Sequence, residues 1–215
     1  MRTHSEILDR LLREKVVAIV RLDNAEGLLS AGEALRLGGI SCIEFTFSTP
    51  GALEMLKEAS ARFGEQVLLG AGTILDPETA VLAIQAGAEF IVTPAFNPRT
   101  IEAAKRAGKP IIAGAMTPTE MLAAWESGAD LVKVFPASAV GGPGYIRAVL
   151  APLPHLRLVP TGGVSADNAA EYLRAGAVAV GVGGKLVDPD AVRRGNWEAI
   201  TAEARRLVTA VSTPP

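Results

Sequence analysis

Residues 90–116 read FIVTPAFNPRTIEAAKRAGKPIIAGAM and contain one complete strand–helix–strand unit. The runs FIVTPA (90–95) and PIIAGAM (110–116) are short and aliphatic, which is typical of parallel strands buried on both faces. The intervening PRTIEAAKRAGK begins with a proline and ends near a glycine, as a helix between two strands commonly does. We therefore predict two parallel strands joined by a helix.

The same unit recurs along the whole chain. Successive aliphatic runs begin roughly 20 to 26 residues apart, which leaves room for one strand, one helix and two short loops. Eight such runs are present: VVAIVR (16–21), CIEFTF (42–47), VLLGAGT (67–73), FIVTPA (90–95), PIIAGAM (110–116), LVKVFPA (131–137), RLVPTGG (157–163) and AVAVGVGG (177–184). Eight similar units predict an α/β fold, a (β/α)₈ TIM barrel. The structural alternative, an open doubly wound sheet, usually has a glycine-rich first turn, which this chain lacks.

The length of the chain fits one domain. A (β/α)₈ barrel begins at roughly 200 residues, and the chain has 215. We therefore expect residues 1–215 to form a single barrel domain, with residues 3–13 as an extra helix before the first strand. Hydrophobic residues make up 49% and aromatic residues 5% of the chain, so the core must be mainly aliphatic.

Composition also bounds the partners and the location. The formal net charge is −2, and no basic block interleaved with aromatic residues favours nucleic acid. Cys42, the only cysteine, lies in an apolar run and is expected to be a small buried side chain. His4 and His155 lie far apart, so we expect no metal site. No signal peptide or membrane span is expected, and we predict a cytoplasmic protein.

Lys133 is the first candidate catalytic residue. It lies in Leu131-Val132-Lys133-Val134-Phe135, where every neighbour is apolar. Strand side chains alternate, so if Val132 and Val134 face the helices, Lys133 faces the barrel interior. Burial disfavours the charged form of an amine, and a neutral amine is a nucleophile that condenses with a ketone to a Schiff base. The alternative is a lysine paired with a carboxylate or extended toward the strand end.

Glu44 is the second candidate. The same alternation in Ile43-Glu44-Phe45-Thr46-Phe47 turns Glu44 and Thr46 inward. A carboxyl group buried near an amine can move protons. The alternative is a structural Lys–Glu pair, and the two roles are compatible.

Other polar or glycine residues lie near the carboxyl ends of strands, where barrel enzymes have their sites. Arg21 could hold a substrate carboxylate, pair with Glu44 or face solvent. Thr73 follows glycines that allow a ligand close to the backbone, and Thr161 and Pro94 are candidates for the wall. Two glycine clusters, Thr161-Gly162-Gly163-Val164 and Gly181-Val182-Gly183-Gly184, follow the seventh and eighth strands, where barrels commonly bind phosphate.

These residues together resemble one known family. The sequence is similar to the 2-keto-3-deoxy-6-phosphogluconate (KDPG) aldolases, which include 4-hydroxy-2-oxoglutarate (KHG) aldolases. The resemblance runs from about Val16 to Val187. It rests on Ile-Glu-Phe-Thr (43–46), Gly-Ala-Gly-Thr (70–73), Phe-Ile-Val-Thr-Pro (90–94), Gly-Ala-Met-Thr-Pro-Thr-Glu (114–120), Leu-Val-Lys-Val-Phe-Pro-Ala (131–137) and Pro-Thr-Gly-Gly-Val (160–164).

The resemblance implies a class I aldolase, usually a homotrimer, that needs no metal or other cofactor. It implies a small 2-keto acid substrate, expected to be phosphorylated. It places the Schiff-base lysine at Lys133 and the acid/base glutamate at Glu44. The implied substrate-binding residues are Arg21, Thr73, Pro94, Phe135, Thr161, Gly162, Gly163, Gly183 and Gly184.

The chain departs from the family pattern at two positions. Ser48 stands where many members have an arginine, so Arg21 is expected to do more of the anion binding. Gly184 stands where many members have a serine, and the adjacent Lys185 could supply charge there or face solvent. Two other functions remain open at this stage. One is a barrel isomerase, decarboxylase or synthase acting on a sugar phosphate without a Schiff base, and the other is a non-catalytic binder of a phosphorylated ligand.

Overall fold

The computed structural model describes residues 2–212, which contain an eight-stranded parallel sheet. The order of the strands is β7-β6-β5-β4-β3-β2-β1-β8. The first and last strands in that order approach each other through a parallel bridge between Thr161 and Gly181 and a 3.0 Å hydrogen bond from the Val178 N–H to the Leu158 carbonyl. The strands are β1 (Val16–Val20), β2 (Cys42–Thr46), β3 (Leu68–Gly72), β4 (Phe90–Val92), β5 (Ile111–Ala115), β6 (Leu131–Val134), β7 (Leu158–Pro160) and β8 (Val180–Val182).

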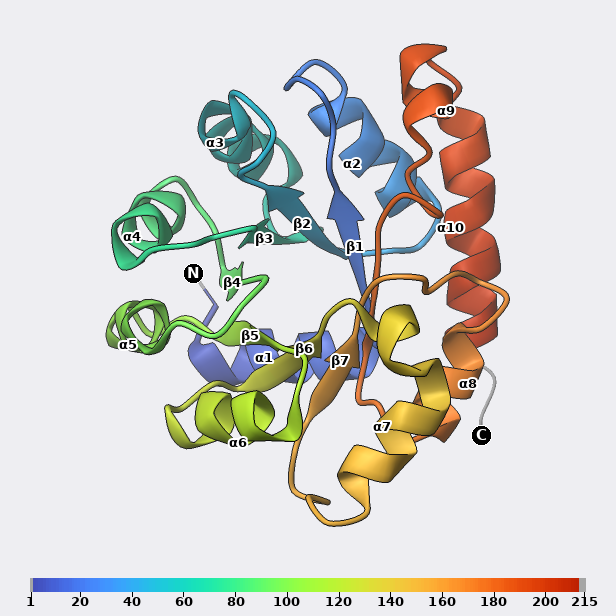
Figure 1. The fold of residues 1–215 in the computed structure, drawn as a ribbon. Helices are drawn as coiled ribbons and strands as arrows, with labels where there is room; N and C mark the ends of the chain where they lie inside the picture. The colour runs from blue at the N-terminus through green and yellow to red at the C-terminus, as the bar shows by residue number, and fades with distance from the viewer. Residues whose placement is uncertain (1, 213–215) are drawn as a thin grey trace.

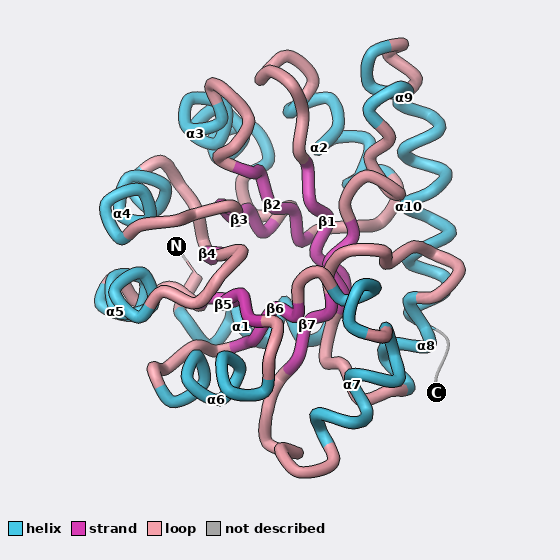
Figure 2. The backbone as a smooth tube through the Cα atoms, viewed as in Figure 1, coloured by secondary structure: helices cyan, strands magenta, loops and turns pink. Residues whose placement is uncertain are grey.

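The helices form a ring around these strands (Figures 1 and 2). The predicted alternation is confirmed, and each predicted strand agrees with the observed one to within a few residues. Two helices follow the last strand. The helices are α1 (His4–Glu14), α2 (Leu28–Leu37), α3 (Ala52–Phe63), α4 (Pro77–Gln85), α5 (Pro98–Arg106), α6 (Pro118–Glu126), the 3₁₀ helix η1 (Ala137–Val140), α7 (Gly142–Leu150), α8 (Ala169–Arg174), α9 (Pro189–Arg193) and α10 (Trp197–Ser212).

The central helices begin where local chemistry favours a start. Pro98 occupies the first position of α5, where a missing N–H costs nothing. The preceding Asn97 accepts hydrogen bonds from the backbone N–H groups of Arg99 and Thr100. Thr117 and Glu120 form a capping box at the start of α6. These two helices therefore begin at defined residues after β4 and β5, which sets the lengths of the two loops between them.

Side chains alternate between two buried layers. Val132, Val134, Ile43 and Phe45 pack in the layer between strands and helices. Leu131 and Cys42 belong instead to a cluster inside the barrel. Seven of the strands contribute residues to this cluster, and the segment just before β8 contributes Ala179. The predicted inward direction of the alternate positions of β2 and β6 is confirmed. Cys42 is fully buried, and burial raises the pKa of its thiol to about 12.

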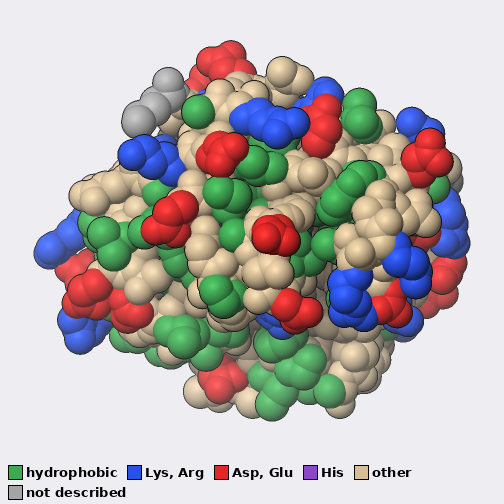
Figure 3. Space-filling view, turned by 90° about the horizontal axis from the view of Figure 1, so that it is seen from above, with side chains coloured by type: hydrophobic (Ala, Val, Ile, Leu, Met, Phe, Trp, Pro, Cys, Tyr) green, Lys and Arg blue, Asp and Glu red, His purple; other side chains and the backbone are tan. Residues whose placement is uncertain are grey.

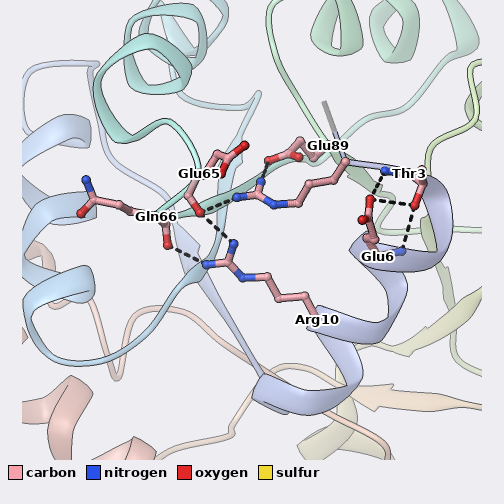
Figure 4. A network of polar contacts seen from close by, with 7 residues as sticks. Thr3, Glu6, Arg10, Glu65, Gln66 and Glu89 are labelled. Carbon is pink, nitrogen blue, oxygen red and sulfur yellow. Dashed lines mark hydrogen bonds and ion pairs between the residues drawn. The ribbon is translucent and has the colours of Figure 1, made fainter.

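Helix α1 covers the end of the barrel at which the strands begin. Its Ile7 and Leu11 are fully buried in the interior cluster. A capping box of Thr3 and Glu6 starts the helix, as Figure 4 shows. Arg10 donates hydrogen bonds to the carbonyls of Glu65 and Gln66, at 3.1 and 2.6 Å, in the loop before β3 (Figure 4). The extra helix predicted at residues 3–13 is confirmed, and it leaves only the opposite end of the barrel open.

The surface shows no segregation of charge on the face seen in Figure 3, where acidic and basic side chains are interspersed among hydrophobic ones. No helix within residues 2–212 is both long and apolar enough to cross a membrane.

Candidate active site

A cavity of about 300 Å³ lies at the carboxyl ends of the strands. Its walls come from β1 and β6 and from the segments that follow β1, β6, β7 and β8. Its lining residues are Ile19, Arg21, Lys133, Phe135, Thr161, Gly162, Gly163, Val164, Gly183, Gly184, Lys185, Val187 and Pro189. The structure thus brings together eight of the eleven predicted site residues. Glu44, Thr73 and Pro94 are not part of this lining.

The cavity concentrates positive charge. Arg21, Lys133 and Lys185 line it, and none of its lining residues is Asp or Glu. None of these three side chains forms an ion pair with any residue between 2 and 212. In a concave site, unpaired charges of one sign attract ligands of the opposite sign. The local field therefore favours an anion, although the chain as a whole carries a charge of −2.

Lys133 lies at the base of this cavity. Strand β6 holds it between Gly114 of β5 and Val159 of β7, and its side chain is only 4% exposed. Its Nζ lies 5.2 Å from the centre of the Phe135 ring. A buried lysine without a carboxylate partner is costly, and such lysines commonly serve as nucleophiles.

Glu44 lies in the barrel wall near Lys133 and is 1% exposed. Its Oε1 has no hydrogen-bond partner in the described structure. Burial raises the pKa of Glu44, while the charges of Lys133 and Arg21 act in the opposite direction. No direct ion pair joins Glu44 to Lys133 or to Arg21, so the two pairings considered from the sequence are not formed. A carboxyl group with a raised pKa holds its proton at higher pH, which suits proton transfer.

Glycines of the barrel strands provide the space for these side chains. A Cβ at Gly72 would lie 1.6 Å from Glu44 Oε1, and a Cβ at Gly181 would lie 2.3 Å from Thr161 Oγ1. Both glycines lie on strands adjacent to the side chain that they accommodate. The position of Glu44 therefore depends on a glycine in the neighbouring strand.

Arg21 and Thr73 approach each other across the barrel mouth. Arg21 Nη2 donates a hydrogen bond of 3.5 Å to Thr73 Oγ1. Thr73 has a φ of 58°, a left-handed conformation that a β-branched residue rarely adopts. Strain of this kind costs about 1–3 kcal/mol and is concentrated at functional sites. Although Thr73 lies outside the cavity lining, its contact with Arg21 connects it to the site.

The glycines after β7 adopt conformations that other residues disfavour. Gly162 and Gly163 have φ values of 91° and 77°. A Cβ at Gly163 would also lie 2.5 Å from Ser138 Cβ, so this loop must pass close to η1. Gly184 differs, because a Cβ there would meet nothing within 4 Å.

Some residues of the site were not expected from the sequence. Ile19 of β1 lines the cavity. It lies two residues before Arg21, and side chains two residues apart along an extended chain face the same side, so the place of Arg21 indicates that of Ile19. Pro94 was expected in the wall, and it does not line this cavity. Its backbone packs against Gly114, the partner of Lys133 in β5, where a Cβ would lie 2.2 Å from the Pro94 carbonyl carbon. No group of three or more His, Cys, Asp or Glu side chains within residues 2–212 is arranged to hold a metal ion.

A lysine and a glutamate buried together inside one barrel are suited to the class of enzymes that act on carbonyl compounds through an amine. The comparisons with known proteins agree with this class. The family model for KDPG and KHG aldolase matches residues 7–203. A 2-dehydro-3-deoxy-phosphogluconate aldolase of Treponema pallidum is 37% identical over 95% of this chain and 97% of its own. A KHG/KDPG aldolase of Escherichia coli K12 is 32% identical over 90% of each chain. The chain belongs to the KDPG/KHG aldolase family. It is an aldolase, a lyase that acts on carbon–carbon bonds.

Solved structures agree with this assignment. The KDPG aldolase of Legionella pneumophila, with pyruvate captured as a covalent carbinolamine, superposes with a TM-score of 0.85 at 30% identity, over 94% of this chain and 97% of that one. A designed cage made by fusing symmetric oligomeric domains gives a TM-score of 0.86 at 30% identity, over 92% of this chain and 72% of that one. A 3-hexulose-6-phosphate synthase from Salmonella typhimurium is 18% identical with a TM-score of 0.70, which shows only a shared fold.

Proposed function

We propose that this aldolase cleaves a 3-deoxy-2-keto acid through a Schiff base on Lys133. Its substrates are KDPG, which gives pyruvate and glyceraldehyde 3-phosphate, and/or KHG, which gives pyruvate and glyoxylate. The observation that carries this proposal is the burial of Lys133, unpaired, at the base of a cationic cavity. The covalent carbinolamine formed by pyruvate in the Legionella enzyme supports it.

The lysine supplies the chemistry that breaks the carbon–carbon bond. After Lys133 has given up its proton, its amine attacks the C2 carbonyl, and loss of water from the carbinolamine gives an iminium ion. Removal of the proton of the C4 hydroxyl turns C4 into an aldehyde, and the electrons of the C3–C4 bond move onto the iminium to form an enamine. Protonation of the enamine at C3 and hydrolysis release pyruvate and regenerate the amine. No external cofactor is required, because the iminium stabilises the developing carbanion.

Glu44 is the proposed acid and base for these proton transfers. Its raised pKa allows it to hold a proton for the departing hydroxyl of the carbinolamine and to accept one at another step. The absence of a direct ion pair between Glu44 and Lys133 in the described structure favours transfer through a bridging water or the substrate itself.

The remaining site residues are assigned to binding. Arg21 and Thr73 hold the carboxylate next to the ketone, since a guanidinium and a hydroxyl are strong donors to a carboxylate. Gly162, Gly163, Gly183 and Gly184 offer backbone N–H groups to a phosphate or second carboxylate at the far end of the substrate. Phe135, Thr161 and Pro94 form or support the wall around the reacting carbons.

The domain extent, location and oligomeric state are proposed from the family resemblance. We propose that the full chain of 215 residues is one barrel domain and that the protein is a cytoplasmic homotrimer. The similarity to a domain used as a symmetric oligomer in a designed cage supports oligomer formation. Its mass in solution, measured by light scattering, tests the trimer.

Steady-state assays test the reaction itself. Pyruvate release is measured with KDPG and with KHG, for the wild-type protein and for Lys133→Ala. The proposal expects release from at least one substrate by the wild-type protein and loss of turnover in the variant. Near-normal turnover by a folded Lys133→Ala variant would exclude a Schiff base on this residue.

A further inference from the structure

Arg21 lies just beyond the hydrogen-bonded part of the barrel sheet. Strand β1 ends at Val20, whose partner in β2 is Phe45, and Arg21 lies one residue beyond that last pair. The side chain of Arg21 is exposed, and its only hydrogen bond in the described structure is the long contact with Thr73. Contacts outside the sheet must therefore determine where the Arg21 guanidinium lies in the cavity.

Two buried threonines hold the peptide groups on both sides of Arg21. Thr46 Oγ1 donates to the Val20 carbonyl at 3.3 Å, and the Leu22 N–H donates to Thr49 Oγ1 at 3.1 Å. Thr46 is 0% exposed and Thr49 is 2% exposed. The peptide group before Arg21 is thus tied to Thr46 at the end of β2, and the one after it to Thr49 in the loop that follows β2.

The hydroxyl groups themselves form a connected set. Ser48 Oγ donates to Thr46 Oγ1 at 3.3 Å, and the Thr46 and Thr49 hydroxyl oxygens lie 3.4 Å apart. A hydroxyl has one proton to donate. Because the proton of Thr46 goes to Val20, Thr49 must be the donor to Thr46, which leaves the Thr49 oxygen free to accept the Leu22 N–H. A single arrangement of protons therefore satisfies all three side chains.

We propose that Thr46, Ser48 and Thr49 are positioning residues that place Arg21 to bind the carboxylate of the 2-keto acid, which rests on the role of Arg21 in the proposed function. These hydroxyls touch no reacting atom and act only through Arg21. The same strand also carries Glu44 two residues before Thr46, so β2 supplies both the proposed proton-transfer group and the support for the proposed anion-binding group.

A substitution at Thr49 tests this proposal. Thr49→Val keeps the shape of the side chain and removes the acceptor of the Leu22 N–H. We expect the KM for the 2-keto acid to rise about tenfold, the effect of losing one buried hydrogen bond, while kcat changes little. Thr49→Ser restores the acceptor and should restore KM. The control is Thr100→Val, because Thr100 is also fully buried but its Oγ1 has no hydrogen-bond partner.

A double-mutant cycle separates positioning from mere stability. Once Arg21 is replaced by alanine, Thr49→Val should raise KM no further. Equal increases in KM in both backgrounds, or an unchanged KM for Thr49→Val with wild-type Arg21, would overturn the proposal. An unchanged KM in Arg21→Ala alone would instead remove Arg21 from the proposed function. If Thr49→Val does not fold, Ser48→Ala replaces it in the cycle, since Ser48 is exposed and its loss weakens the same set.

Discussion

Gly72 of β3 forms the space occupied by the carboxylate of Glu44, because any Cβ at residue 72 would lie 1.6 Å from Glu44 Oε1. Residue 72 pairs with Thr46, two positions beyond Glu44 on β2. The carboxylate therefore extends along the inner wall toward the open end of the barrel, and the glycine fixes how far toward the cavity it can reach.

Gly72→Ala should separate the position of Glu44 from its chemistry. The added methyl group displaces the carboxylate, and we expect kcat to fall by about 10²-fold or more, the low end of what a general acid or base contributes. Steady-state kinetics with a circular dichroism check of folding measure this. Gly144→Ala is the control, because a Cβ at Gly144 meets nothing within 4 Å, and it should retain wild-type turnover. Full activity in Gly72→Ala would mean that the observed position of Glu44 is not required.

Glu44→Gln removes the titratable proton but keeps the size of the side chain. We expect turnover to fall by about 10²- to 10⁴-fold while the protein remains folded. The measurement is kcat with KDPG or KHG, together with the thermal unfolding midpoint. Unchanged turnover would reduce Glu44 to a structural residue.

The raised pKa of Glu44 also predicts a pH dependence of stability. In the unfolded chain a glutamate ionises near about pH 4.3, whereas burial raises the pKa of Glu44 in the folded protein. Between these two values the folded state binds the extra proton, so the contribution of Glu44 to stability is fully present below the unfolded value and is lost as pH rises through the folded value. Urea unfolding across this range should show a decline in the wild-type protein that is smaller in Glu44→Gln. Parallel curves for the two proteins would contradict the raised pKa.

Lys185 should contribute to the choice of substrate. It lines the cavity on the loop after β8, without an ion-pair partner among the residues that the structure describes. We expect Lys185→Ala to raise the KM for phosphorylated KDPG about tenfold, with a smaller effect for KHG, whose far end carries less charge. Arg194→Ala provides a control that removes one exposed cation outside the cavity lining. Equal changes for both substrates would place Lys185 outside the recognition of the far anion.

Much of the fold and of the site could be predicted because both follow from strand periodicity. Strands buried on both faces appear as aliphatic runs, and a charged residue inside such a run must face the interior, as Lys133 and Glu44 do. The family resemblance then supplied roles for the residues at the strand ends. The periodicity does not determine how these residues lie relative to one another.

Other features depend on which residues of separate strands become neighbours. The space that Gly72 gives to Glu44 exists only in the observed register of β2 and β3. The contacts of Thr49 with the backbone beside Arg21 cross from one loop to another, and no local pattern signals them. The approach of the Pro94 backbone to Gly114, the partner of Lys133 in β5, depends on how closely two segments pack, and no local pattern signals it.

The covalent role of Lys133 is the central claim, and trapping with borohydride tests it most directly. Borohydride reduces an imine to a stable amine, so incubation with pyruvate and borohydride should leave one pyruvyl adduct per chain, mapped to Lys133 by peptide mass spectrometry. The Lys133→Ala protein should acquire none. A folded wild-type protein that forms no adduct with excess pyruvate, or forms it at another lysine, would contradict the proposed mechanism.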